Sequence, residues 1–141
     1  MAEIKPGVRE AFGMLHADLE ASGLGAYQFH LVDTGSTHSG DRLFAAALPD
    51  GSYDGHSGRY MYYDRLTEIK DLLLAIAGSA QDALFEVEGV IWPRCAEHQS
   101  RLGTPEPSPD GRPVWWCDAM GGHALALIGQ LLGQVRYDRR S

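Results

Sequence analysis

Two short pairs of metal-ligand residue types constrain the fold of this chain more than any other feature. Two residues separate Cys95 from His98 in the first pair, and five separate Cys117 from His123 in the second. Zinc prefers thiolate and imidazole ligands arranged as a tetrahedron, and sites with four protein ligands are usually structural. The spacing therefore predicts a closed, structural Zn²⁺ site formed by Cys95, His98, Cys117 and His123.

The segment that carries these pairs is poor in aliphatic residues. Five of the seven prolines lie between residues 93 and 113, and all three tryptophans lie between residues 92 and 116. Such a segment cannot build its own core, so it must dock on the rest of the chain, bind a metal, or do both. Asp110-Gly111 is typical of a hairpin turn and would fold the second pair back over the first.

Other interpretations of these residues remain open. Cys95 and Cys117 could be small buried apolar residues or form a disulfide, which a cytoplasmic location disfavours. The two histidines could be surface residues, in which case His123 would not complete the site.

The neighbouring tryptophans give a further expectation. Side chains alternate along a strand, so Trp115 and Trp116 should point to opposite faces. We predict that one packs against the rest of the chain while the other is partly exposed, as a contact for a partner. Burial of both is the alternative.

The first 91 residues are predicted to begin with a helix followed by strands. Apolar residues recur at helical spacing from Pro6 to Leu24. The period changes to two over Tyr27–Leu31, and Leu43–Leu48 is apolar on both faces, so each is predicted to be a strand. Arg59–Tyr63 is a third strand candidate, and a polar loop is expected over Asp33–Asp41.

Two helices are predicted next. The first runs from Asp64 and stops at Gly78, and the second starts at a capping box over Ser79–Asp82. The stretch Leu84–Trp92 continues this second helix or forms a strand instead, because Val, Ile and Phe favour extended backbone.

The predicted architecture is therefore α+β. It consists of an N-terminal helix, two to three antiparallel strands, two helices and a C-terminal zinc-knuckle-like lobe. Residues 1–91 are expected to form the α+β body. Residues 92–141 are expected to form a Pro/Trp-rich, zinc-binding lobe that ends in a helix or strand.

Charge and hydropathy argue against nucleic-acid binding and against a membrane span. The net charge is −7, and residues 1–91 hold fourteen acidic against six basic side chains. Such a surface lacks the clustered cations that bind a phosphate backbone, so no nucleic acid is expected. The N-terminus has no signal-peptide pattern, and the longest aliphatic run, Leu72–Ala77, is far too short to span a membrane. We expect a bacterial-type cytoplasmic protein.

One resemblance concerns residues 83–132. The segments Trp92-Pro93-Arg94-Cys95-Ala96-Glu97-His98, Asp110-Gly111, Trp115-Trp116-Cys117 and Ile128-Gly129-Gln130-Leu131 resemble the C-terminal tail of a family of uncharacterised bacterial proteins from high-GC genomes. That tail reads W-P-x-C-P-x-H, D-G, W-x-C and I-G-x-L, and the resemblance implies no known activity. Ala96 replaces the family's usual proline, and a second histidine expected just after His98 is missing.

Two patterns in the sequence could carry catalysis, and each also has a simpler explanation. The run Leu31-Val32-Asp33-Thr34-Gly35-Ser36 resembles the signature of aspartic proteases, which pair two aspartates, so a single copy would require a homodimer. Ordinary turn chemistry also explains Asp-Thr-Gly after a strand. A metal-dependent hydrolase could use the loop residues His30, His38, His56, Asp33, Asp41 and Asp54.

The sequence therefore favours a noncatalytic cytoplasmic binding or adaptor protein with a structural zinc site. A protein partner or a homo-oligomer is expected, with no nucleic acid and no membrane. A hydrolase, through Asp33 in a homodimer or through the His/Asp loop, is the alternative.

Overall fold

The computed structural model describes residues 5–36, 40–54, 61–98, 102–131 and 136–139, and its architecture is α+β as expected. The helices are α1 (Pro6–Ala21) and α2 (Ile69–Glu88), with short 3-10 turns at Tyr63–Arg65 and Ala119–Gly121. The strands are β1 (His30–Ser36), β2 (Arg42–Ala47), β3 (Met61–Tyr62), β4 (Val90–Arg94), β5 (Thr104–Pro107), β6 (Pro113–Cys117), β7 (His123–Leu127) and β8 (Arg136–Arg139).

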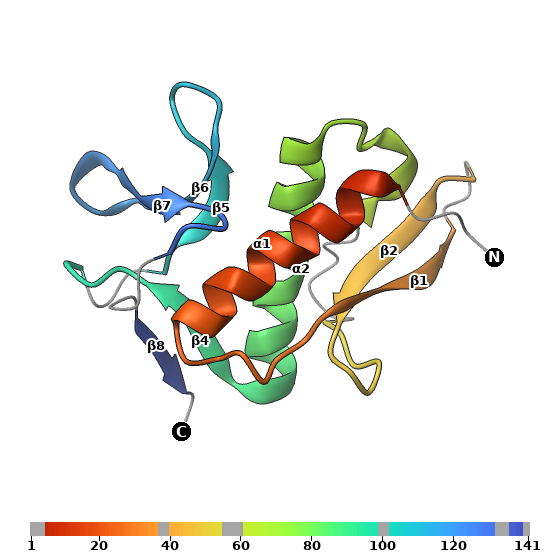
Figure 1. Ribbon diagram of the computed structural model, residues 1–141, viewed down its shortest axis with the longest axis horizontal. Coiled ribbons are helices and arrows are strands. Elements are labelled where there is room, and N and C mark those ends of the chain that lie inside the picture. Colours follow the sequence, from red (N-terminus) through yellow and green to blue (C-terminus); the bar gives the residue numbers. More distant parts are fainter. Residues whose placement is uncertain (1–4, 37–39, 55–60, 99–101, 132–135, 140–141) are drawn as a thin grey trace.

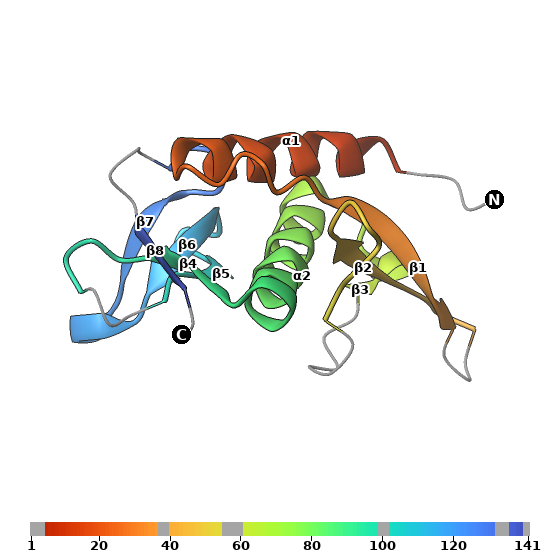
Figure 2. The ribbon, with the colours of Figure 1, turned by 90° about the horizontal axis from the view of Figure 1, so that it is seen from below.

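The strands form three small antiparallel sheets. Their orders are β1-β2-β3, β4-β8 and β5-β6-β7. Figures 1 and 2 show α2 between the β1–β3 sheet on one side and the strands β4 to β8 on the other, while α1 crosses over α2. Neither helix of the described residues combines the length and the apolar character that a membrane-spanning segment requires.

Helix α1 confirms the prediction for the N-terminus. Pro6 occupies the first helical turn, where its missing N–H is no loss. Val8, Phe12, Leu15 and Leu19 are buried on one face. The helix ends at Ala21, and Gly23 follows with a φ of +79°, a left-handed conformation that favours glycine.

The first strand lies later in the chain than predicted. We expected a strand over Tyr27–Leu31 and a loop from Asp33, but β1 extends to Ser36. The backbone N–H of Tyr27 donates to the carbonyl of Leu24 (3.1 Å), and that of Phe29 donates to Nε2 of His16 (2.9 Å). These donors are therefore not used to pair with β2.

The bond to His16 makes the stability of the protein depend on pH. Burial lowers the pKa of the half-buried His16 ring, so its contribution to stability is present above the unfolded pKa of about 6.5 and is lost as pH falls through the lower folded pKa. We expect His16→Gln to make the free energy of unfolding less dependent on pH. The difference should stay below about 1 kcal/mol, because solvent screens a half-exposed ring.

The measurement is thermal unfolding of the wild type and of His16→Gln from pH 8 to pH 5. Both proteins carry the same Cys95, His98, Cys117 and His123, so any contribution of these residues to the pH profile is common to both. Parallel melting-temperature profiles for the two proteins would contradict a role for His16.

The other strands of the N-terminal part agree with the sequence. Strand β2 matches the predicted strand over Leu43–Leu48 to within one residue at each end, and it lies at the centre of its sheet. Strand β3 lies within the predicted Arg59–Tyr63 segment, of which residues 59 and 60 fall outside the described residues.

The prediction of two successive helices is wrong, because α2 runs without a break from Ile69 to Glu88. Gly78 is buried, and an added Cβ would lie 3.7 Å from Pro105 of β5. The hydroxyl of Ser79 accepts the backbone N–H of Ala46 (2.9 Å) instead of capping a new helix. Packing on both sides thus outweighs the cost of an internal glycine, about 1 kcal/mol.

The two ends of α2 also differ from the prediction. Residues 63–65 form a separate 3-10 turn, which the Lys5 ammonium fixes by donating to the carbonyls of Tyr63 and Leu66 (2.6 Å each). At the other end Gly89 adopts a φ of +67°, which closes the helix. The stretch Leu84–Trp92 is therefore helix as far as Glu88 and strand from Val90.

One hydrophobic core joins the N-terminal and C-terminal parts of the chain. It includes buried residues from α1, β2, α2, β4 and β6, together with Ile128 and Leu131. Trp92 and Trp115 are fully buried and meet edge to face, with ring centroids 5.0 Å apart. The division at residue 91 stays a prediction, although strand β4 crosses that position.

Asp18 of α1 ties the C-terminal part to this core. Its carboxylate is 1% exposed and accepts the indole N–H of Trp115 (2.8 Å) and the backbone N–H groups of Gly129 (2.7 Å) and Leu131 (2.9 Å). Burial raises the pKa of Asp18, and these three donors oppose that rise. The indole N–H of Trp92 donates to the Ser22 hydroxyl (2.8 Å), so both buried tryptophans are bonded to groups at the C-terminal end of α1.

Candidate metal centre

The four predicted ligands lie at the ends of strands in the C-terminal part. Cys95 follows β4 directly, and His98 lies three residues further on. Cys117 is the last residue of β6 and His123 the first of β7, and the two are partners in the antiparallel register. The sheet therefore places the second ligand pair side by side.

The predicted hairpin turn positions the second pair as expected. Strands β5 and β6 pair antiparallel, and Asp110 and Gly111 lie in the turn between them. The backbone N–H of Ser108 donates to the carbonyl of Arg112 (2.8 Å), and Gly111 has a φ of +87°, which favours glycine.

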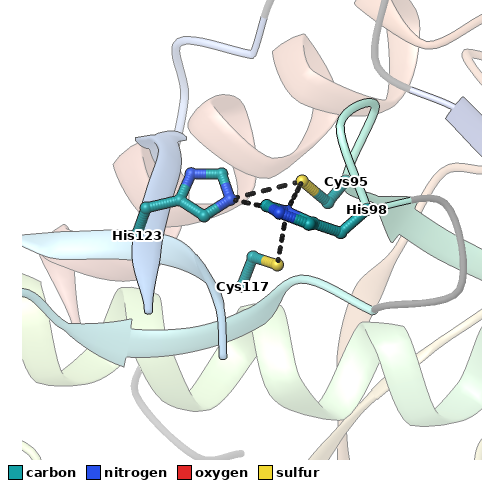
Figure 3. A group of neighbouring side chains, drawn as sticks. All are labelled: Cys95, His98, Cys117 and His123. Atoms are coloured by element: carbon teal, nitrogen blue, oxygen red, sulfur yellow. Dashed lines mark hydrogen bonds between the residues drawn. The ribbon is translucent and has the colours of Figure 1, made fainter. Parts of the chain in front are cut away.

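The four side chains converge on one point, as Figure 3 shows. Nδ1 of His98 lies 3.4 Å from Sγ of Cys95, 3.7 Å from Sγ of Cys117 and 3.3 Å from Nε2 of His123. Nε2 of His123 lies 3.3 Å from Sγ of Cys95. All four ligand atoms lie within 4.8 Å of one another.

Hydrogen bonding alone does not account for this arrangement. A ring nitrogen of histidine either donates one proton or accepts at one lone pair. Nδ1 of His98 nevertheless faces three polar atoms at once. A cation at the centre would satisfy all four electron-rich atoms together, and the group could hold a metal ion.

The spacing of the atoms fits a tetrahedral ion. With Zn–S near 2.3 Å and Zn–N near 2.0 Å, tetrahedral angles separate a sulfur from a nitrogen by about 3.5 Å and two nitrogens by about 3.3 Å. Three of the four S···N distances are 3.3, 3.4 and 3.7 Å, and the N···N distance is 3.3 Å. Four of the six edges of the ligand tetrahedron thus lie within about 0.2 Å of those of such a site.

The two sulfurs are buried among apolar side chains. Cys95 and Cys117 are 2% and 0% exposed, and they form a small apolar cluster with Ala119 and Leu125. Burial raises the pKa of the Cys117 thiol, and the backbone N–H of Ala119, which bonds to this thiol, opposes the rise. A thiolate here would therefore need a positive charge beside it. Residue spacing predicted the four residues of this cluster, but it gave no signal for the backbone donor at Ala119.

The two adjacent tryptophans confirm the predicted difference in burial, while contact of Trp116 with a partner stays a prediction. Trp115 is fully buried in the core, whereas Trp116 is half-buried. An added Cβ at Gly122 would lie 2.4 Å from the Trp116 ring, so the ring covers the backbone directly before His123. Trp116 therefore packs against the turn that presents a ligand.

Substitution of Gly122 by alanine should disturb this turn. Gly121 and Gly122 both have a positive φ, +89° and +95°, but an added Cβ at Gly121 meets nothing within 4 Å. Gly121→Ala therefore serves as the control for a substitution at positive φ, which costs about 1–3 kcal/mol in backbone strain. We expect Gly122→Ala to cost about 1–3 kcal/mol more, because the Trp116 ring must move.

Chemical denaturation of both variants at equal metal content measures this difference. Equal midpoints for Gly121→Ala and Gly122→Ala would show that the contact with Trp116 contributes nothing.

The residues of the hydrolase alternatives are spread along the N-terminal part. Asp33 is exposed on β1, an edge strand, and its Oδ1 accepts the N–H of Gly35 (2.9 Å). His30 is also exposed, and Asp41 forms an ion pair with Arg65. His38 and His56 lie outside the described residues. Within the described part of the chain, the Cys95 group is the one set of three or more His, Cys, Asp or Glu residues with converging ligand atoms.

Comparison of the chain with protein-family models, with curated proteins and with solved structures finds no match. The resemblance of residues 83–132 to a bacterial family therefore stays a prediction.

Proposed function

We propose that this protein is a noncatalytic, cytoplasmic binding or adaptor protein in which a structural zinc ion holds the C-terminal part, and that its partner is a protein. The observation that carries this proposal is the spacing of the four ligand atoms. Four of the six separations among the two thiol sulfurs and the two imidazole nitrogens match those of a tetrahedral ion, and all four ligand atoms lie within 4.8 Å of one another.

The ligand types select zinc among common metals. Thiolate and imidazole together suit zinc, which binds them in a tetrahedron without redox chemistry. Calcium and magnesium need oxygen ligands, and none of the four ligand residues supplies one.

A structural role follows from the number of ligands. Four protein ligands fill a tetrahedral ion and leave no position for a water or a substrate, unlike catalytic sites with three protein ligands. The acidic composition supports a protein partner over a nucleic acid. The half-buried Trp116, beside the site, is a candidate contact.

Elemental analysis of protein purified without chelator tests the proposal. We expect about one zinc per chain. His123→Ala should at least weaken the binding of the metal, because it removes one of the four proposed ligands. The matched control is His30→Ala, an exposed histidine on β1, which should retain the full metal content. Wild-type protein without bound metal would overturn the proposal.

A further inference from the structure

The turn between Cys117 and His123 holds a methionine in an uncommon backbone conformation. Met120 has a φ of +56° and a ψ of +39°, a left-handed conformation that residues other than glycine rarely adopt. Gly121 and Gly122 follow it and also have a positive φ. Met120 is thus the one residue of this left-handed stretch that carries a side chain.

The Met120 side chain lies almost wholly in solvent. It is 90% exposed, whereas the other exposed large apolar residues of the described chain are at most 43% exposed. Met14 is the other methionine whose side chain the structure describes, and it is half-buried against the hydrophobic core. A dissolved reagent therefore reaches the thioether of Met120 far more easily than that of Met14.

The two cysteines of the chain are protected where Met120 is not. Cys95 and Cys117 are 2% and 0% exposed. Oxidation of a sulfur by a peroxide depends on the reactivity of that sulfur and on its exposure to solvent. Burial of both thiols thus removes the groups that would otherwise compete with Met120 for an oxidant.

We propose that Met120 is an oxidation site, which a hydroperoxide converts to methionine sulfoxide while the four residues of the candidate metal centre stay unmodified. The thioether sulfur attacks one oxygen of the peroxide, so that an S–O bond forms as the O–O bond breaks. The proton on the transferred oxygen passes to the departing hydroxide, which leaves as water. The sulfur loses two electrons, and the peroxide gains them.

The modification changes the surface of this turn without disturbing its packing. A sulfoxide is polar, whereas a thioether is apolar. Because the side chain is 90% exposed, the added oxygen meets water instead of a packed core. The fold and any bound metal should therefore be retained. The inference goes beyond the proposed function and does not rest on it, since no step uses a bound metal.

Peptide mass spectrometry of the folded, full-length protein tests the site. The protein is treated with hydrogen peroxide, and samples are stopped with catalase at successive times. We expect a gain of about 16 Da at Met120 at least about fivefold faster than at Met14. Cys95 and Cys117 should still react with a thiol reagent after denaturation, and the metal content should not change.

Two controls show that the fold sets this order. In concentrated urea both methionines are exposed, so Met120 and Met14 should oxidise at rates within about twofold of each other. Met120→Leu should abolish the fast gain of mass, whereas Met14→Leu should retain it. Exchange of methionine for leucine keeps the apolar volume, so both variants should fold.

The outcomes separate this inference from the proposed function. Equal oxidation rates of Met120 and Met14 in the folded protein would overturn the oxidation site, as would modification of Cys95 or Cys117 before Met120. Loss of metal in step with oxidation of Met120, but not in Met120→Leu, would also overturn it, because the centre would not be spared. Protein purified without any metal would overturn the proposed function and leave the oxidation site standing.

Discussion

Removal of the metal should lower the melting temperature of the protein by roughly 10–20 °C and loosen the strands around the site. Structural zinc contributes about 10–16 kcal/mol in small zinc-finger peptides. A smaller loss, about 3–5 kcal/mol, is expected here, because Trp92 and Trp115 stay packed in a core that does not include the ligands. Cys117→Ser should have the same effect as a chelator.

Hydrogen exchange should locate the change. Amides in residues 93–98 and 114–127 should exchange faster after chelation, whereas those of α1 and of β2 should keep their protection. Glu97→Gln, an exposed position between two ligands, is the control and should retain metal and stability. An unchanged melting curve after complete removal of the metal would contradict a structural role for the site.

Replacement of Asp18 by alanine should destabilise the protein by about 3–5 kcal/mol, a large part of the 5–15 kcal/mol that is typical of a small protein. The substitution leaves three N–H donors without their acceptor, those of Trp115, Gly129 and Leu131. Each buried donor that loses its partner costs about 1–3 kcal/mol. Asp18→Asn should be milder, because an amide keeps one acceptor oxygen but turns an NH₂ group toward a donor.

Glu20→Ala is the matched control for Asp18. Glu20 lies two residues later on α1 and is exposed, so its loss should change the free energy of unfolding by less than about 0.5 kcal/mol. Urea denaturation of the three variants gives the comparison. If Asp18→Ala unfolds at the same urea concentration as Glu20→Ala, the carboxylate does not tie the C-terminal part to α1.

Residue type and spacing alone predicted the candidate metal site. Cysteine and histidine carry their ligand chemistry wherever they lie, and a gap of two residues between Cys95 and His98 already requires a tight turn. The Asp110-Gly111 turn is also local. It joins β5 to β6, the strand that ends at Cys117. A gap of five residues does not by itself bring His123 next to Cys117. The pairing of β7 with β6 does so.

Contacts between residues that are distant in the sequence determined the structure at the positions where local patterns were wrong. Gly78 and the capping-box residues after it predicted the end of one helix and the start of another. The helix continues because Gly78 faces Pro105 and Ser79 bonds to Ala46, contacts that appear only once β5 and β2 pack on α2. Likewise β1 starts at His30 because Phe29 gives its N–H to His16, thirteen residues earlier in the chain.

The sequence by itself determined the helix over α1, the central strand β2, the α+β class and the Cys and His residues of the candidate metal site, since each depends on local periodicity or on the chemistry of a side chain. Only the tertiary structure determined the unbroken α2, the position of β1 and the burial of Asp18 beneath Trp115. A single aspartate within an apolar helical stripe could not by itself indicate its partners. Those partners lie about a hundred residues away in the chain, and only the folded core brings them together.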